Sequence, residues 1–397
     1  MDVVVVGAGQ AGLAVSNALE TRGVEHVVLE AERIASSWRG RWDGFTLVTP
    51  NWTLALPGAP YDGDDPEGHV GRDLIVDYLE AYADAHAGEI RAGVRVERIT
   101  AGHAGRFLLD TSEGPLTCDR VVVCTGAYRR VHRPSVAGAL PAHVTVLDTT
   151  SYRAPGDLAE AGVLIVGSGQ SGVQLAEEIH ASGRPVTLAC GRAPWLPRRA
   201  GGRDIVTWLE RTSYFEKTLA DLPDPTWRLA PNAQLTGARG GHDLHLRTLQ
   251  RQGVTLAGRL TGVRDGHATF ADDLSESVDF GDRWYADVRR LLATELGPDA
   301  PALPVPEPFH AEPRTELDLA GVATVIFTCG FRPDHARWIE FPVFDELGFP
   351  VVDDDLATSV PGLFFCGVHL LRNRRSSLMW GVGADAAIVA ETLARRR

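Results

Sequence analysis

The stretch VVVVGAGQAGLAV, residues 3–15, decides the fold of this chain of 397 residues. Its four valines predict a buried parallel strand, and the residues that follow predict a helix as far as Leu19. Between them stands the pattern Gly-x-Gly-x-x-Gly. The first glycine permits a tight turn, the second lets a pyrophosphate approach the backbone, and the third lets the helix pack on the strand. The pattern predicts a dinucleotide site built by Gly7, Gly9, Gln10, Ala11 and Gly12.

The next predicted strand, Val27 to Leu29, ends at Glu30. A carboxylate at that position can accept hydrogen bonds from the ribose of a dinucleotide, while the helix N-terminus faces the phosphates. The alternative is a glycine-rich turn without a ligand. Because strand, helix and acid all occur in the required order, we interpret the stretch as a cofactor site.

The stretch VLIVGSGQSGVQL, residues 163–175, repeats the pattern. It predicts a second dinucleotide loop, made by Gly167, Ser168, Gly169, Gln170, Ser171 and Gly172. The copies differ later: Cys190 stands where Glu30 stands in the first copy, and Arg192 follows it. Loss of the acid and gain of an arginine suit the 2′-phosphate of NADPH. The alternative for Arg192 is a solvated surface arginine.

Two dinucleotide loops in one chain indicate two cofactors. We expect that one cofactor, FAD, keeps electrons and that the other, NADPH, delivers them. We therefore predict an α/β fold with two Rossmann-like domains, in which the NADPH domain is inserted into the FAD domain. The predicted bounds are 1–155 and 323–397 for the FAD domain and 156–322 for the NADPH domain. Further strands are predicted to end at Cys124-Thr125-Gly126, at Gly330 and at Gly367.

Composition narrows the class of protein. The formal net charge of −13 argues against nucleic acid or an anionic membrane surface as partner. No apolar run approaches the roughly 20 residues of a membrane helix, and no secretory signal is visible. Five scattered cysteines without a Cys-x-x-Cys pair are typical of a reduced cytoplasm. The oligomeric state stays open, with a homodimer as one option.

The order of the motifs resembles that of the group B flavin-dependent monooxygenases over nearly the full chain. The resemblance rests on both glycine loops and on SSWRGRWDGF from Ser36, TPN at 49–51 and CTG at 124–126. A bacterial subgroup of CzcO type is closer still, through LVTPNW from Leu47 and RRSSL from Arg374. The chain departs from the family fingerprint at Asp148, where the family has a histidine.

The resemblance implies FAD, NADPH and O2, with a flavin C4a-hydroperoxide that inserts one oxygen atom into a small-molecule substrate. N- or S-oxygenation is the leading expectation. An NADPH oxidase or quinone reductase, and a nucleotide-sensing flavoprotein with little turnover, are the alternatives. A disulfide reductase is disfavoured because no Cys-x-x-Cys pair is present.

Individual residues carry these expectations. Asn51 is the catalytic candidate, since its amide can bond near the flavin; the alternative is an asparagine that caps a turn. Further cofactor contacts are expected at Trp38, Arg39, Trp42 and Thr49, although loop packing is the favoured alternative for Trp42. Arg374, Arg375 and Trp380 are predicted to bind the substrate. No metal is predicted, because His242 and His245 lack the further ligands of a tetrahedral site.

Overall fold

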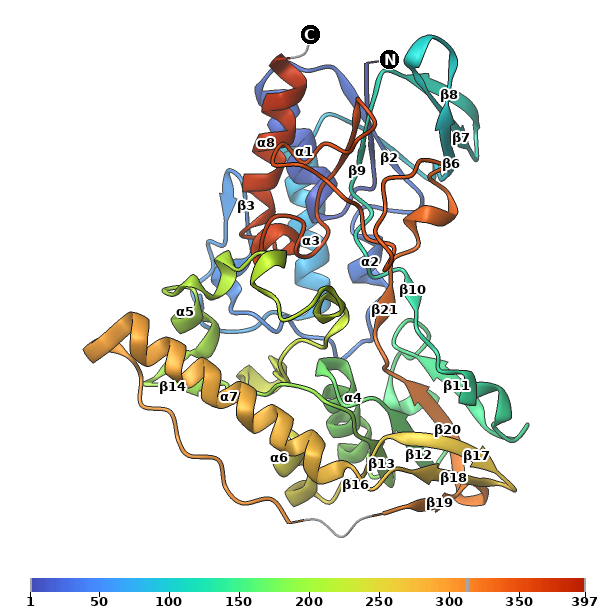
Figure 1. The fold of residues 1–397 in the computed structure, drawn as a ribbon, viewed down its shortest axis with the longest axis vertical. Helices are drawn as coiled ribbons and strands as arrows, with labels where there is room; N and C mark the ends of the chain where they lie inside the picture. Colours follow the sequence, from blue (N-terminus) through green and yellow to red (C-terminus); the bar gives the residue numbers. More distant parts are fainter. Residues whose placement is uncertain (1, 311–313, 396–397) are drawn as a thin grey trace.

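The computed structural model describes residues 2–310 and 314–395, and two parallel five-stranded sheets organise it. One sheet lies in the upper half of Figure 1 and the other in the lower half. Each glycine loop stands at the carboxyl end of the central strand of its sheet, β1 (Val3–Val6) in one and β12 (Gly162–Val166) in the other. The mixed α/β class with two dinucleotide-binding folds is therefore confirmed.

The first sheet has the strand order β22-β9-β1-β2-β5, with all neighbours parallel. Its strands are β1 (Val3–Val6), β2 (His26–Glu30), β5 (Glu89–Ala92), β9 (Arg120–Val123) and β22 (Leu363–Phe365). One face packs on α1 (Gln10–Thr21), α3 (Arg72–His86) and α8 (Val382–Arg395). The other face packs on a meander of β6 (Val96–Ala101), β7 (Phe107–Thr111) and β8 (Gly114–Cys118). Cover on both faces explains why all four valines of β1 are buried.

The second sheet has the order β11-β20-β12-β13-β16, also parallel throughout. Its strands are β11 (Thr145–Asp148), β12 (Gly162–Val166), β13 (Val186–Ala189), β16 (Thr255–Ala257) and β20 (Val322–Phe327). One face packs on α4 (Gln170–Ala181), α6 (Leu246–Gln252) and the start of α7 (Leu274–Leu296). The other face packs on β17 (Leu260–Arg264), β18 (His267–Phe270) and β19 (Glu316–Asp318).

The strand pairing differs from the domain bounds that the sequence suggested. The bounds 1–155 and 323–397 place β11 and nearly all of β20 with the first domain, but both strands belong to the second sheet. The reason is the linker between them. A short antiparallel ribbon of β10 (Arg130–Val131) and β21 (Phe331–Arg332) carries both crossings, so the chain changes sheet earlier and later than expected.

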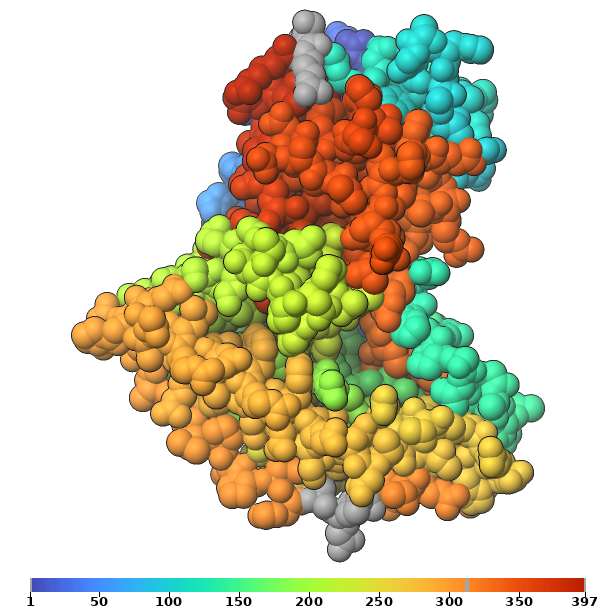
Figure 2. Space-filling view, viewed as in Figure 1, coloured from blue at the N-terminus to red at the C-terminus, as the bar shows by residue number. Residues whose placement is uncertain are grey.

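The remaining elements are short and lie mostly around the junction of the two sheets. They are α2 (Ser36–Arg39), α5 (Ile205–Leu209), β3 (Ala55–Leu56), β4 (Ala59–Pro60), β14 (Arg199–Ala200) and β15 (Arg203–Asp204). In the space-filling view the segment near residues 205–240 presses against the C-terminal segment at the waist of the molecule (Figure 2). Within the described ranges, no helix is both long and apolar enough to cross a bilayer.

Candidate functional site: two dinucleotide loops and the junction between them

The first glycine loop joins β1 to α1 and leaves no room for a side chain at Gly12. Gly7 has φ +105°, in the region that favours glycine, and a Cβ on Gly12 would lie 1.8 Å from the carbonyl oxygen of Gly7. A Cβ on Gly9, by contrast, would meet no protein atom within 4 Å. No side chain caps the start of α1, so its first backbone N–H groups are available to an anion. This cradle fits the pyrophosphate of a dinucleotide.

Side chains expected near the first cofactor surround this loop. The carboxylate of Glu30, which is buried, accepts a hydrogen bond of 2.8 Å from the backbone nitrogen of Ala8. The indole nitrogen of Trp38 donates to the Gln10 amide oxygen at 3.0 Å. The Gln10 amide nitrogen in turn donates to the carbonyl of Ser377 at 3.2 Å, which ties the loop to the approach to α8. Glu30, Trp38 and Gln10 are thus all held at the first glycine loop.

Two neighbouring strand ends complete the first site. Gly126, with φ +65°, follows β9, and Gly367, with φ +81°, follows β22. A Cβ on Gly367 would lie 2.3 Å from the Cβ of Ala11, so only glycine lets this turn approach the start of α1. Cys124 is buried beneath the loop. The Thr125 hydroxyl lies 3.1 Å from Nε2 of His335, whose pKa burial lowers to about 4, so the imidazole is neutral near pH 7.

The second glycine loop repeats this construction between β12 and α4. Gly167 has φ +107°, and a Cβ on Gly172 would lie 1.9 Å from the Gly167 carbonyl oxygen. The Ser168 hydroxyl does not point to an open site, because it bonds both the nitrogen and the oxygen of Gly191. The Gln170 amide nitrogen donates to Ala233 at 3.0 Å. Ser171 begins α4 together with Gln170, and Gly330 follows β20 beside this loop with φ +78°.

Arg192 directly follows Gly191, which Ser168 binds, and lies just beyond the carboxyl end of β13. Its side chain is exposed, and in the part of the chain that the structure describes no ion pair involves it. The carboxyl end of this strand is where the adenosine ribose of a bound dinucleotide lies in Rossmann folds. The position suits a 2′-phosphate, and this role stays a prediction.

The Asn51 side chain is buried, but its amide serves the loop. Its nitrogen donates to the carbonyl of Asp65 at 2.8 Å, and its oxygen accepts from the backbone nitrogen of Val70 at 2.7 Å. The Thr49 hydroxyl lies 2.6 Å from that of Thr53. Asn51 therefore joins residues 49–53 to residues 65–70. A catalytic role would use the second amide hydrogen, and it stays a proposal.

Two expected cofactor contacts have partners within the protein. Arg39 pairs with Glu80 of α3 and donates to the carbonyl of Ile34, so an acidic side chain already balances its charge. Trp42 is 2% exposed and packs in the core of the second sheet, edge-on to Phe45 at 5.1 Å. Each residue thus has a structural partner that the sequence did not indicate, and its contact with the flavin stays a prediction.

In the basic loop before α8, Arg375 and Trp380 bind acidic side chains, whereas Arg374 does not. Arg375 pairs with Glu210 at 2.5 Å and with Glu216 at 2.7 Å, and the Trp380 indole donates to Glu210 at 3.1 Å. These two residues hold the loop to the insert through their polar groups, and their role in binding substrate stays a prediction. Arg374 has no acidic partner among the described residues.

Sequence reasoning missed a buried charged cluster at the junction. Arg198, Asp204 and His69 are almost completely buried. Arg198 pairs with Asp204 and also donates to the carbonyl of Val48 at 2.8 Å. His69 lies 3.4 Å from Asp204 and 3.2 Å from the Thr49 carbonyl. The cluster locks the insert to the loop that carries Asn51. No motif signals it, because its members are far apart in sequence.

We expect the substitution Arg198→Met to lower the free energy of unfolding by about 3–5 kcal/mol, because it leaves Asp204 buried without its cation. The measurement is urea unfolding followed by circular dichroism. Arg199→Met is the matched control: Arg199 is exposed, and its loss should change stability by no more than about 0.5 kcal/mol. Equal unfolding midpoints for both variants would show that the cluster does not stabilise the junction.

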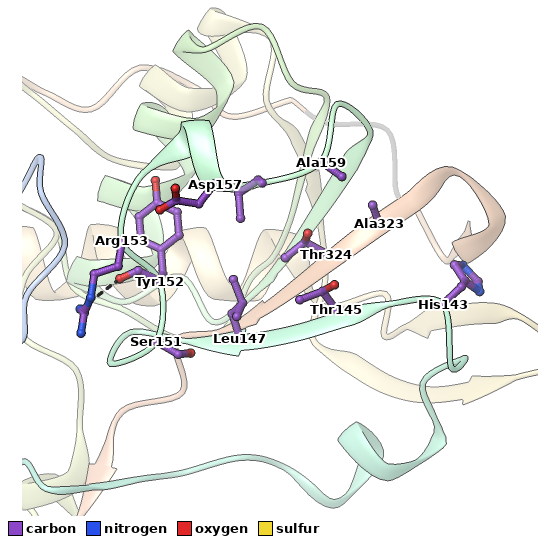
Figure 3. Close-up of a pocket in the computed structure, with 11 residues that line it drawn as sticks. His143, Thr145, Leu147, Ser151, Tyr152, Arg153, Asp157, Ala159, Ala323 and Thr324 are labelled. Atoms are coloured by element: carbon purple, nitrogen blue, oxygen red, sulfur yellow. Dashed lines mark hydrogen bonds between the residues drawn. The ribbon is translucent and has the colours of Figure 1, made fainter.

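One cavity lies apart from both glycine loops. Its volume is about 290 Å³, and Figure 3 shows it against β11 and β20 under the loop that carries Tyr152 and Asp157. Thr145 at the start of β11 lines it, whereas dinucleotides bind beyond the carboxyl ends of such strands. Its polar lining is engaged, since Arg153 donates to the carbonyls of Gly40 and Tyr152. We assign this cavity no part in the reaction.

Comparison with known proteins agrees with the two-loop geometry. The family described as "Pyridine nucleotide-disulphide oxidoreductase" matches residues 4–218, more than half of the chain. A CzcO-like oxidoreductase from Geobacillus kaustophilus is 28% identical over 97% of this chain and 96% of its own. The indole-3-pyruvate monooxygenase YUCCA1 from Oryza sativa is 33% identical over 50% of each chain.

Solved structures share the whole fold. A flavin-containing monooxygenase from Stenotrophomonas maltophilia has a TM-score of 0.70 at 18% identity, over 100% of this chain and 98% of that one. The bacillithiol disulfide reductase of Staphylococcus aureus has a TM-score of 0.67 at 12% identity, over 100% and 99%. At such identities the likeness shows the fold alone. Family match, full-length relatives and two fitted dinucleotide loops together identify the chain as an FAD- and NADPH-dependent oxidoreductase of the pyridine nucleotide-disulphide oxidoreductase family.

Proposed function

We propose that this flavoprotein is a monooxygenase, which transfers one oxygen atom from O2 to the nitrogen or sulfur of a small molecule. The observation that carries the proposal is the pairing of two complete dinucleotide loops across one locked junction. FAD would be held by the loop at Gly7–Gly12, and NADPH by the loop at Gly167–Gly172. Bound flavin would supply the oxygen-activating chemistry, while the protein orients the two cofactors and excludes water.

The thiols favour oxygen transfer over disulfide reduction. Disulfide exchange needs a thiolate, which a raised pKa suppresses. Burial raises the pKa of Cys118 to about 12 and that of Cys329 to about 11. Burial also raises the pKa of Cys190, and that of Cys366 is raised chiefly by its hydrogen bond with Cys124. Four of the five thiols are therefore protonated at physiological pH, which argues against a thiol-based reductase despite the fold shared with such enzymes.

The test is a panel of thioethers and amines offered to the holoenzyme with NADPH and ¹⁸O2. The expected result is product that contains one ¹⁸O atom, formed in proportion to the NADPH consumed. NADPH consumption matched by hydrogen peroxide across the whole panel, with no labelled product, would favour an NADPH oxidase. Negligible consumption of NADPH would favour a nucleotide-sensing flavoprotein.

Cofactor preference gives a separate prediction. We expect Arg192→Ala to raise the KM for NADPH by about 10–100-fold, because a charge-assisted hydrogen bond contributes roughly 1.5–3 kcal/mol. The KM for NADH, which has no 2′-phosphate, should hardly change. Steady-state oxidation of both nucleotides measures this, with Arg192→Lys as the variant that keeps the charge. An equal loss with NADPH and NADH would assign Arg192 to something other than the 2′-phosphate.

A further inference from the structure

The loop of residues 372–375 carries three arginines, and two of them pair with acidic side chains. Arg372 pairs with Asp385 at 2.9 Å, and Arg375 pairs with Glu210 and Glu216. Arg374 stands between them and pairs with no acid in residues 2–310 or 314–395. A half-buried guanidinium without a counter-charge is unfavourable unless a ligand supplies one.

Arg374 is nevertheless held in a fixed place. Its backbone nitrogen donates to the carbonyl of Lys217 at 3.1 Å, and its guanidinium lies 4.8 Å from the centre of the Tyr214 ring. Its Nη1 makes a long contact of 3.4 Å with the Tyr214 hydroxyl. Its Nε is buried and finds no hydrogen-bond acceptor among the described residues. Most of its five donors are therefore unused, although the side chain is held in place.

The acids nearby are already engaged, so they do not neutralise Arg374. Glu210 receives Arg375 and the indole nitrogen of Trp380. Glu216 receives Arg375 and the side-chain amide of Asn373. Burial raises the pKa of Tyr214, against which the charge of Arg374 acts, so the phenol is neutral near pH 7 and cannot serve as the missing anion.

A row of aromatic rings connects this arginine to the loop of Asn51. Ring centres are separated by 5.7 Å between Trp52 and Trp380, by 5.4 Å between Trp380 and Phe215, and by 5.0 Å between Phe215 and Tyr214. Trp52 and Trp380 come from the first domain, whereas Phe215 and Tyr214 come from the insert. We call these four residues the aromatic row. It begins next to Asn51 and ends under the guanidinium of Arg374.

We propose that Arg374 recognises the carboxylate of the substrate, whose apolar body lies along the aromatic row. A planar guanidinium with free donors matches a carboxylate in two parallel hydrogen bonds, and the rings offer apolar contact beside it. The inference rests on the proposed monooxygenase function and names its substrate class: small carboxylates that carry a thioether or amine. Arg374 is thus the anchor that sets which end of the substrate faces the flavin.

The experiment compares an acid with its neutral isostere on the holoenzyme. The probes are (phenylthio)acetate and (phenylthio)acetamide, which share the sulfur and the ring and differ in charge. Binding to the oxidised enzyme is read from perturbation of the flavin absorbance, which needs no turnover. The variants are Arg374→Gln, Arg374→Lys and Tyr214→Phe, with the rate of flavin reduction by NADPH recorded for each.

We expect wild type to bind the acid at least about 10-fold more tightly than the amide, as one charge-assisted pair predicts. Arg374→Gln should abolish this difference, Arg374→Lys should restore part of it, and Tyr214→Phe should keep most of it, because the ring remains. Flavin reduction by NADPH should be unchanged in all three variants. Equal binding of acid and amide by wild type would overturn the inference, as would an Arg374→Gln defect confined to NADPH, which would point to a nucleotide phosphate.

Failure of the proposed function gives a different result. If the protein prefers the acid through Arg374 but makes no oxygenated product, carboxylate binding by Arg374 would stand and the monooxygenase function would be refuted. If the protein oxygenates acid and amide with equal efficiency, the monooxygenase function would stand and carboxylate recognition by Arg374 would be refuted.

Discussion

Gly12→Ala should give a protein that does not retain FAD. The added Cβ would lie 1.8 Å from the Gly7 carbonyl oxygen, so α1 must move away from β1 and the phosphate cradle opens. We expect at least about 100-fold weaker FAD binding, equivalent to more than about 2.7 kcal/mol, or a failure to fold. Flavin absorbance per protein after purification measures the outcome.

Gly9→Ala is the matched control for this prediction. A Cβ at Gly9 meets no protein atom within 4 Å, and the residue has φ −84° and ψ −172°, which alanine adopts freely. Gly9→Ala should therefore fold like wild type and lose flavin only because the methyl group occupies the place of the pyrophosphate. Full flavin content in both variants would show that FAD does not bind at this loop.

Gly172→Ala should leave the protein yellow but unable to accept electrons from NADPH. Its Cβ would lie 1.9 Å from the Gly167 carbonyl oxygen and 2.8 Å from the Thr328 hydroxyl, in the second sheet. The first sheet has its own core, so FAD should remain bound. We expect flavin reduction by NADPH to slow by at least about 100-fold at fixed NADPH concentration.

Stopped-flow measurement of flavin bleaching under anaerobic conditions tests this, with dithionite as the control reductant. Dithionite should reduce wild type and Gly172→Ala equally, because it does not use the nucleotide site. If NADPH reduced the flavin of Gly172→Ala at the wild-type rate, the nicotinamide would not reach the flavin from the second loop.

The parts of the structure that the sequence predicts well are the local ones. Each Gly-x-Gly-x-x-Gly pattern constrains a turn of a few residues, and the buried strand before it needs no distant partner to be recognised. Both loops, the acid at Glu30 and the α/β class therefore follow from the sequence. The exact ends of a helix such as α7 (Leu274–Leu296) are harder to predict, because amphipathic spacing marks helix ends poorly.

The roles of individual loop residues could not be predicted, because they depend on partners far away in sequence. Asn51 binds the backbone of residues 65–70, Arg39 meets α3, and Trp42 enters the core of the other domain. The segment from Asp204 to Leu222 forms α5 and short 3₁₀ turns, and its side chains contact Arg375, Trp380 and Glu67 across the junction. Arg374 differs from Arg372 and Arg375 because those two arginines pair with acidic side chains.

The proposed monooxygenase must hold activated oxygen long enough to transfer it. The most direct measurement reduces the holoenzyme with NADPH without oxygen, mixes it rapidly with oxygenated buffer, and follows O2 consumption, hydrogen peroxide release and the return of oxidised-flavin absorbance together. We predict that O2 is consumed well before peroxide and oxidised flavin appear. Simultaneous appearance of all three signals, unchanged when a substrate that binds is present, would contradict the account and favour an oxidase.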